Sequence, residues 1–305
     1  DSQFHENLTR LELFHPRSEE DMFTVYSFLH AEVGVSDEPV AWEDRLKLKY
    51  RPVAEGESWG VDWQSGWFHL TGQVPGSWRG EVVLRLNLGG EALVFDDKGA
   101  PVCGLTNASV YHPDYYKEVF FFEKAVKAGC RIDMWVEAAA HNGLGPAQFN
   151  WYPHAPREPY PAGHSVGTVK YMRIALFNGE LRRFRNEFLQ LWHYVEYLKR
   201  DVKNYRCRQI AKALSDALDV YCGNPENAAA ARRVLAPILS QKALSSALKC
   251  TAIGHAHIDV GWLWPVRESV RKAGRTFSSQ LRLMKRYPGY VFGASQPQLY
   301  QFVKD

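Results

Sequence analysis

The spacing of apolar residues changes from two to between three and four in the second half of the chain, and this change limits the possible folds most. Between residues 46 and 177, apolar and polar residues alternate in short runs separated by Gly and Pro. In EVVLRLNLGG, for example, Val82, Leu84 and Leu86 fall on one side. Successive side chains of a strand point to opposite faces, so the alternation predicts many short strands. Short strands with almost no helix are typical of an antiparallel β-sandwich of the jelly-roll type, which we place at residues 31–177.

A hairpin is predicted inside this region. In VFDDKGAPV, the residues Asp97, Lys98 and Gly99 stand between two apolar pairs, which is a common signal for two antiparallel strands joined by a turn. The residues before the sandwich, 1–30, are predicted to be a short, partly helical lead-in. Their stretch SEEDMFTVYSFLHAEV starts with acidic residues, as the first turn of a helix often does.

A helical linker is predicted at residues 178–245. In GELRRFRNEFLQLWHYVEYLKR the apolar residues recur at intervals of three and four, which is the spacing of one helix face. A second helix with the same pattern follows and stops at CGNPEN, where Asn224 can cap and Pro225 can open a third helix.

Residues 246–305 are predicted to begin a different domain. The apolar run CTAI is followed by a loop, by a helix that starts near Pro265, by the strand YVFGAS and by a further helix, QPQLYQFVKD. Strand, helix, strand, helix is the opening of a parallel α/β unit. One and a half such units cannot close a barrel, so we expect the first βαβ elements of an incomplete α/β barrel.

Composition excludes several classes of partner. The formal charge of +3 is too small to indicate nucleic acid or an anionic membrane, and no apolar run reaches membrane-spanning length. The five cysteines are scattered and form no CxxC pair, which is typical of reduced thiols. The N-terminus lacks signal-peptide character, although it also lacks a starting Met. We therefore expect a cytoplasmic protein.

The stretch GHAHIDVGWLWP, residues 254–265, holds the candidate site. His257 and Asp259 stand two apart near the C-terminal end of a predicted parallel strand, where α/β folds place their sites. Imidazole nitrogen and carboxylate oxygen suit zinc and other divalent metals, but two ligands do not complete a site. On spacing alone, a His–Asp hydrogen bond without metal is the simpler interpretation. Trp262 and Trp264 fit either a sugar-stacking platform or core packing.

Further weight comes from a resemblance. The segment GHAHIDVGWLWPVRESVRKAGRTFSSQLRLMKRYPGYVFGASQPQLY resembles the start of the catalytic domain of class II α-mannosidases, glycoside hydrolase family 38, and is most similar to the cytosolic branch. The resemblance implies that His257 and Asp259 bind zinc and that Trp262 lines the sugar site. It also implies retaining hydrolysis of α-mannosides, with an aspartate nucleophile and a second carboxyl as acid and base.

The resemblance stops short of the catalytic groups. The family's nucleophile motif, Trp-x-x-Asp-x-Phe-Gly, does not occur in residues 1–305, so the catalytic residues are expected beyond Asp305. The expected substrate is a mannose-containing oligosaccharide, cleaved by the complete protein and not by these residues alone.

Two other functions fit parts of the sequence. A non-catalytic carbohydrate-binding module would use the jelly-roll-like region and the 10 Trp residues. A metal-dependent carbohydrate deacetylase also uses Asp and His on an α/β barrel, but it lacks the β domain and the WLWP motif. The sandwich itself is expected to scaffold the barrel or to form the interface of a homo-oligomer.

Overall fold

The computed structural model describes residues 2–13, 19–61, 63–106, 117–141, 166–200, 204–243, 245–262 and 264–304. The chain divides into two compact units. The first unit comprises Asp1–Tyr26, Arg79–Glu81 and Leu176–Lys249, and the second comprises Ser27–Trp78, Val82–Ala175 and Cys250–Asp305. No helix among the described residues is long and apolar enough to cross a membrane.

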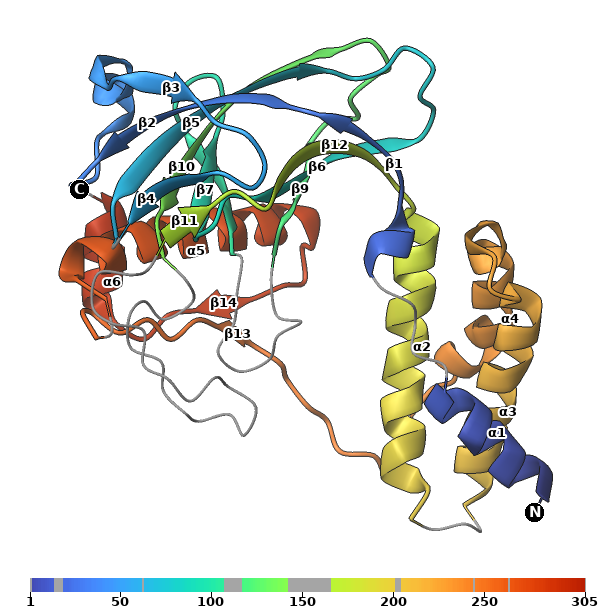
Figure 1. Cartoon of the computed structure of the whole chain (residues 1–305). Helices are drawn as coiled ribbons and strands as arrows, with labels where there is room; N and C mark the ends of the chain where they lie inside the picture. Colours follow the sequence, from blue (N-terminus) through green and yellow to red (C-terminus); the bar gives the residue numbers. More distant parts are fainter. Residues whose placement is uncertain are drawn as a thin grey trace. The chain divides into compact units, whose positions relative to one another are not determined.

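The first unit is built from helices (Figure 1). They are α1 (Ser2–Leu13), α2 (Gly179–Leu198), α3 (Tyr205–Tyr221) and α4 (Ala228–Leu239), with the short 3-10 helices η1 (Glu19–Met22) and η3 (Pro225–Asn227). The helices that the sequence predicts after the sandwich are thus confirmed. Asn224 caps as predicted, because its side chain accepts a hydrogen bond from Glu226 N at 3.0 Å. Pro225 lies in η3 rather than at the start of α4.

Apolar faces hold these helices together. The residues of α2 that face inward are the ones spaced at three and four in the sequence: Leu181, Phe184, Phe188, Leu191 and Val195. Between α4 and α2, Arg232 binds Glu187 at 2.6 Å and Glu180 at 2.7 Å.

One part of the lead-in prediction is wrong. The acidic start of this stretch forms only the short helix η1, and the residues after it form strand β1 (Phe23–Phe28) and strand β2 (His30–Ser36). The sequence FTVYSF is rich in aromatic and β-branched residues, which fit a pleated sheet better than a helix. The acidic start therefore predicts a single turn and not a longer helix.

Antiparallel sheets form most of the second unit, as predicted. A six-stranded sheet has the order β3-β2-β5-β10-β7-β8, and a four-stranded sheet has the order β1-β12-β6-β9. Besides β1 and β2, the strands are β3 (Tyr50–Pro52), β4 (Ser58–Val61), β5 (Ser65–Gln73), β6 (Glu81–Asn87), β7 (Ala92–Phe95), β8 (Pro101–Leu105), β9 (Val119–Phe121), β10 (Arg131–Ala139), β11 (Val166–Thr168) and β12 (Tyr171–Phe177). Strands β11 and β4 form a separate pair.

Buried apolar side chains come from both large sheets. Val33 and Phe68 of the six-stranded sheet and Leu84 and Ile174 of the four-stranded sheet are all 0% exposed. The predicted hairpin is also confirmed, because β7 and β8 pair as antiparallel neighbours around the turn that contains Gly99, whose φ is +84°. Glycine adopts this left-handed conformation without strain.

The last segment adds a parallel βαβ unit. Strand β13 (Gly254–His255) pairs in parallel with β14 (Phe292–Gly293), and helix α5 (Val266–Arg286) joins them (Figure 1). Helix α6 (Pro297–Lys304) follows. Ile258, Ala273 of α5 and Leu299 of α6 form a small buried core. The strand is therefore at residues 254–255 and not at CTAI, which precedes it.

Candidate metal centre

His257 and Asp259 lie in the loop that leaves β13. The Nε2 atom of His257 is 3.2 Å from Oδ1 of Asp259, and the two side chains are 65% and 40% exposed. On its other side, Nδ1 of His257 is 3.4 Å from the Gln296 amide, which follows β14. The structure thus brings the two predicted ligands together at the carboxyl end of the parallel pair. His255 lies in β13 and is exposed.

The main chain of this loop is fixed by one hydroxyl group. Ser269, in the first turns of α5, is fully buried, and its Oγ donates a hydrogen bond to the Asp259 carbonyl at 3.0 Å. The same oxygen accepts hydrogen bonds from Gly261 N at 2.9 Å and from Trp264 Nε1 at 3.0 Å. Gly261 has a φ of +75°, a conformation that L side chains rarely adopt.

The two tryptophans of the loop differ in their surroundings. Trp264 Nε1 also lies 3.2 Å from the Asp259 carbonyl, so the indole contributes to the loop's internal hydrogen bonds. Trp262 is 50% exposed and meets Trp264 edge to face, with ring centroids 5.5 Å apart. Trp262 therefore presents open aromatic surface beside His257 and Asp259 in the chain, whereas Trp264 supports the loop.

A buried ion-pair cluster joins α5 to the six-stranded sheet. Its cations all come from α5, and two of its three carboxylates come from the sandwich. Lys272 Nζ is 2.5 Å from Glu91, Arg275 bridges Glu91 at 3.0 Å and Glu268 at 2.5 Å, and Arg271 pairs with Glu137. The helix can approach the sheet closely because Gly104 of β8 faces it: an added Cβ there would be 2.7 Å from Arg275 Cβ.

Sequence reasoning missed this cluster. Its members are Glu91, Glu137, Glu268, Arg271, Lys272 and Arg275. Polar residues with strand or helix spacing are ordinarily solvated, so nothing in the local pattern predicts their burial. The available signal is a set of cations on the helix face that also carries the buried Glu268 and Ser278.

Three ligand-type side chains lie close together inside the cluster. Glu91, His141 and Glu268 place one possible ligand atom each within 4.8 Å of the others. Their carboxylates, however, are already paired with Lys272 and Arg275. Three cations face three carboxylates, so the cluster is neutral without an ion. A divalent ion there would leave two uncompensated positive charges in a buried site, and the donor set does not fit a metal.

The cluster should make stability depend on acidity. Burial alone would raise the pKa of Glu91 and of Glu268, but the neighbouring cations hold both pKa values below the ordinary 4.5. Such carboxylates stabilise the fold above the unfolded pKa, and the stabilisation is lost as the pH falls through the folded value. The urea concentration at the unfolding midpoint should therefore be constant between pH 7 and about pH 5, and it should decrease once the pH is below about 4.5. A Glu91→Gln variant should lose less on acidification, and equal losses would contradict this origin.

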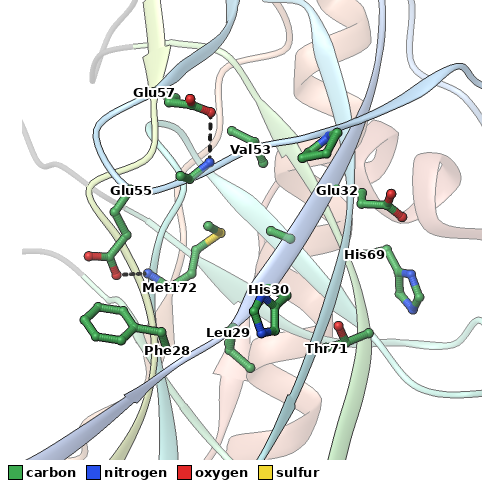
Figure 2. A pocket seen from close by; sticks show the side chains of 13 residues that line it. Phe28, Leu29, His30, Glu32, Val53, Glu55, Glu57, His69, Thr71 and Met172 are labelled. Atoms are coloured by element: carbon green, nitrogen blue, oxygen red, sulfur yellow. Dashed lines mark hydrogen bonds between the residues drawn. The ribbon is translucent and has the colours of Figure 1, made fainter.

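A separate open pocket of about 840 Å³ lies on the sandwich (Figure 2). Phe28, His30 and Glu32 line it from β1 and β2, and His69 and Thr71 line it from β5. Glu55 at its edge accepts a hydrogen bond from Met172 N at 2.9 Å and also binds Arg173. None of the lining residues belongs to the loop that carries His257 and Asp259.

Two family profiles match the chain in succession. The first, described as "Alpha-mannosidase, jelly roll domain", matches residues 26–163, and the second, "Glycosyl hydrolases family 38 N-terminal domain", matches residues 247–305. The second match contains the His257–Asp259 loop, α5 and β14.

Individual relatives agree with the profiles. The chain is 26% identical to alpha-mannosidase 2C1 of Homo sapiens over 272 residues, which is 88% of this chain and 25% of that protein. Alpha-mannosidase G of Dictyostelium discoideum is 26% identical over 276 residues, which is 88% of this chain and 24% of that protein. Alpha-mannosidase of Saccharomyces cerevisiae is 51% identical over 51 residues, which is 17% of this chain and 5% of that protein. The chain thus spans about a quarter of the first two relatives, and it belongs to the glycosyl hydrolase family 38 α-mannosidases, whose N-terminal portion it matches.

Proposed function

We propose that the complete protein is a metal-dependent α-mannosidase that hydrolyses terminal α-mannosides with retention of configuration. The observation that carries the proposal is the placement of His257 Nε2 and Asp259 Oδ1, 3.2 Å apart, in an exposed loop within the family 38 match. Mannose-containing oligosaccharides are the proposed substrates. The family membership favours this function over the deacetylase alternative.

The distance between the two side chains fits joint binding of one ion. Two ligands that each lie about 2.1 Å from a zinc ion are separated by roughly 3.0–3.4 Å. Among the described residues, Asp259 has no Lys or Arg partner, so its carboxylate is not neutralised by a side chain. His257 and Asp259 would hold the ion together with ligands from elsewhere, and a bound zinc would supply Lewis-acid contact to sugar hydroxyls.

Gln296 also fits the arrangement. Its amide oxygen Oε1 is buried without a hydrogen-bond partner, while its Nε2 faces His257 Nδ1. The two amide atoms are interchanged by a half-turn of the side chain. After that turn, Oε1 would accept a hydrogen bond from Nδ1–H, which fixes the tautomer with an unprotonated Nε2 directed toward Asp259. Histidine ligands of metals are commonly oriented in this way.

We also propose that α5, α6, β13 and β14 begin an α/β barrel that further chain completes. Parallel sheets are normally covered on both faces, yet β13 and β14 have two residues each and exposed apolar neighbours. Those exposed side chains are Leu281, Met284, Tyr287 and Val291.

Residues 1–305 alone are proposed to be inactive, because they lack the family's nucleophile motif. Trp262 is proposed to stack on the sugar ring.

A cytoplasmic location is proposed because the five cysteines are scattered and all are free, as is typical of a reducing compartment. Two of them, Cys103 and Cys207, are buried. The domain limits 1–30, 31–177, 178–245 and 246–305 likewise remain proposals.

The function is tested by chelation of the complete protein. We expect hydrolysis of an aryl α-mannoside to stop after treatment with a chelator and to return when Zn²⁺ or Co²⁺ is added. An aryl β-mannoside should not be cleaved under any of these conditions. Full activity in a preparation in which metal analysis finds no transition metal would contradict the proposal.

A second candidate, carbohydrate binding by the sandwich, is favoured by the pocket in Figure 2. Phe28 is 65% exposed in this pocket, which His30 and Glu32 also line, and an open aromatic ring in a pocket with polar residues is a usual sugar contact. Titration of the 305-residue chain with a mannobiose decides the matter. Binding that is lost in Phe28→Ala and kept in Tyr197→Ala, which removes another exposed ring, would support this function; no binding would exclude it.

A further inference from the structure

We propose that Lys272, Trp264 and Ser269 are positioning residues that fix the main chain at Asp259 relative to the sandwich sheet. The inference rests on the proposed metal site for its functional meaning, but the contacts that carry it are independent of any metal. They form one continuous path from a sandwich carboxylate, through a helix lysine and an indole ring, to the carbonyl group of Asp259.

The path ends at the Asp259 carbonyl. This oxygen receives hydrogen bonds from Ser269 Oγ at 3.0 Å and from Trp264 Nε1 at 3.2 Å. Gly261 N in turn donates to Ser269 Oγ at 2.9 Å. The hydroxyl therefore uses its single proton on Asp259 and its lone pairs on Gly261 and Trp264, so the loop between residues 259 and 264 is closed around a fully buried side chain.

The middle of the path is Lys272. Its Nζ lies 4.5 Å from the centroid of the Trp264 ring and 2.5 Å from Glu91 Oε2. The lysine side chain is only 13% exposed, so both contacts occur where water screens them weakly. A single cation thus holds the indole ring on one side and the sandwich on the other.

The path begins on the sandwich at Glu91. The residue before it, Gly90, is so close to β10 that an added Cβ would lie 1.7 Å from the Ala139 carbonyl oxygen. The Glu91 main-chain N–H donates to His141 Nε2 at 3.3 Å, and Arg275 holds the same carboxylate from α5 at 3.0 Å. The position of Glu91 is consequently determined by the sheet.

The ion-pair cluster is explained better by the register of α5 on the sheet that it selects than by a gain in folding stability. Buried ion pairs are often no more stabilising than apolar residues of similar size, because desolvation offsets the attraction. They do penalise other registers, in which charges would be left unpaired. A helix that slides or rotates on the sheet would separate Lys272 from Glu91 and carry Ser269 away from Asp259. The cluster therefore selects the one register in which the Asp259 loop is closed.

The test uses three substitutions in the complete protein. Lys272→Met removes the charge and keeps the length of the side chain, whereas Lys272→Arg keeps a cation. Trp264→Phe removes the indole N–H but keeps an aromatic ring for the contact with Lys272. It leaves the ion pairs intact, so it changes the loop without disturbing the cluster. Lys285→Met is the matched control, because it makes the same replacement on an exposed part of α5.

Two quantities are measured, of which one does not involve metal. We expect hydrogen–deuterium exchange of the segment 259–264 to accelerate at least about tenfold in Lys272→Met and Trp264→Phe, and Lys272→Arg and Lys285→Met to match the unsubstituted protein. Co²⁺ affinity, followed by its visible absorption spectrum, should fall about 10- to 100-fold in the first two variants, which is the usual effect of losing a group that orients a metal ligand.

The outcomes separate this inference from the proposed function. Unchanged exchange in both Lys272→Met and Trp264→Phe would overturn the positioning role. Faster exchange with unaltered Co²⁺ affinity and spectrum would overturn its connection to the site. Faster exchange in a protein that binds no Co²⁺ even without substitutions would support the positioning of the loop and refute the metal-dependent function instead.

Discussion

The complete protein should lose its metal and its mannosidase activity when Asp259 is replaced by alanine. This chain contributes two side chains to the proposed site, and Asp259 supplies the charged one, 3.2 Å from His257 Nε2. Without it a neutral imidazole alone would remain from this segment. Loss of the ion removes Lewis-acid stabilisation worth several kcal/mol, and about 4 kcal/mol corresponds to a loss of roughly 1000-fold in kcat/KM. Metal analysis and steady-state kinetics measure both effects.

The sandwich offers a matched control for this variant. His69 and Asp133 form another His–Asp pair, 2.8 Å apart and partly exposed, on strands β5 and β10. Asp133→Ala should therefore leave metal content and kcat/KM unchanged. If Asp259→Ala retained the metal and turned over substrate like Asp133→Ala, the assignment of the site would be wrong. Thermal unfolding of both variants should be close to that of the unsubstituted protein, since Asp259 supports the loop through its main-chain carbonyl.

The second large effect is expected on stability, from Arg275→Met. Arg275 is 6% exposed on its side chain and lies between Glu91 and Glu268, at 3.0 Å and 2.5 Å. Removing the cation leaves two neighbouring carboxylates without their shared partner in a buried site. Breaking a buried ion pair in this way costs about 3–5 kcal/mol of unfolding free energy. Urea denaturation of the 305-residue chain measures the change.

A control and a pH series make this prediction specific. Arg286→Met removes an arginine from the exposed end of the same helix and should change the unfolding free energy by less than about 0.5 kcal/mol. The deficit of Arg275→Met should shrink as the pH falls from 7 toward 4, because burial without Arg275 raises the pKa of Glu268 and Glu91 and their protonation removes the uncompensated charge. A deficit that stays constant from pH 7 to pH 4 would point to lost packing instead of charge.

Local patterns are sufficient to predict most of the elements. Alternation in EVVLRLNLGG and the Asp97-Lys98-Gly99 turn predict strands and a hairpin, because the period of two and the turn residues are properties of adjacent positions. The same holds for α2 and for the parallel pair around α5. The lead-in prediction is wrong at β1, where aromatic and β-branched residues follow the acidic start and form a strand.

The candidate site could be predicted only in part. His257 and Asp259 are two residues apart, so their proximity follows from the spacing. The partners that fix the loop come from other segments: Ser269 from α5, Gln296 from after β14, and Glu91 from the sandwich. Burial of Glu91 and Glu137 depends on how α5 packs on the six-stranded sheet, which no pattern within either segment encodes.

The most direct test is to locate the metal in crystals of the complete protein by anomalous scattering at the zinc absorption edge. The proposed His257–Asp259 site predicts one strong peak within about 2.0–2.2 Å of His257 Nε2 and of a carboxylate oxygen of Asp259. A peak among Glu91, His141 and Glu268, or no peak at saturating zinc, would contradict it.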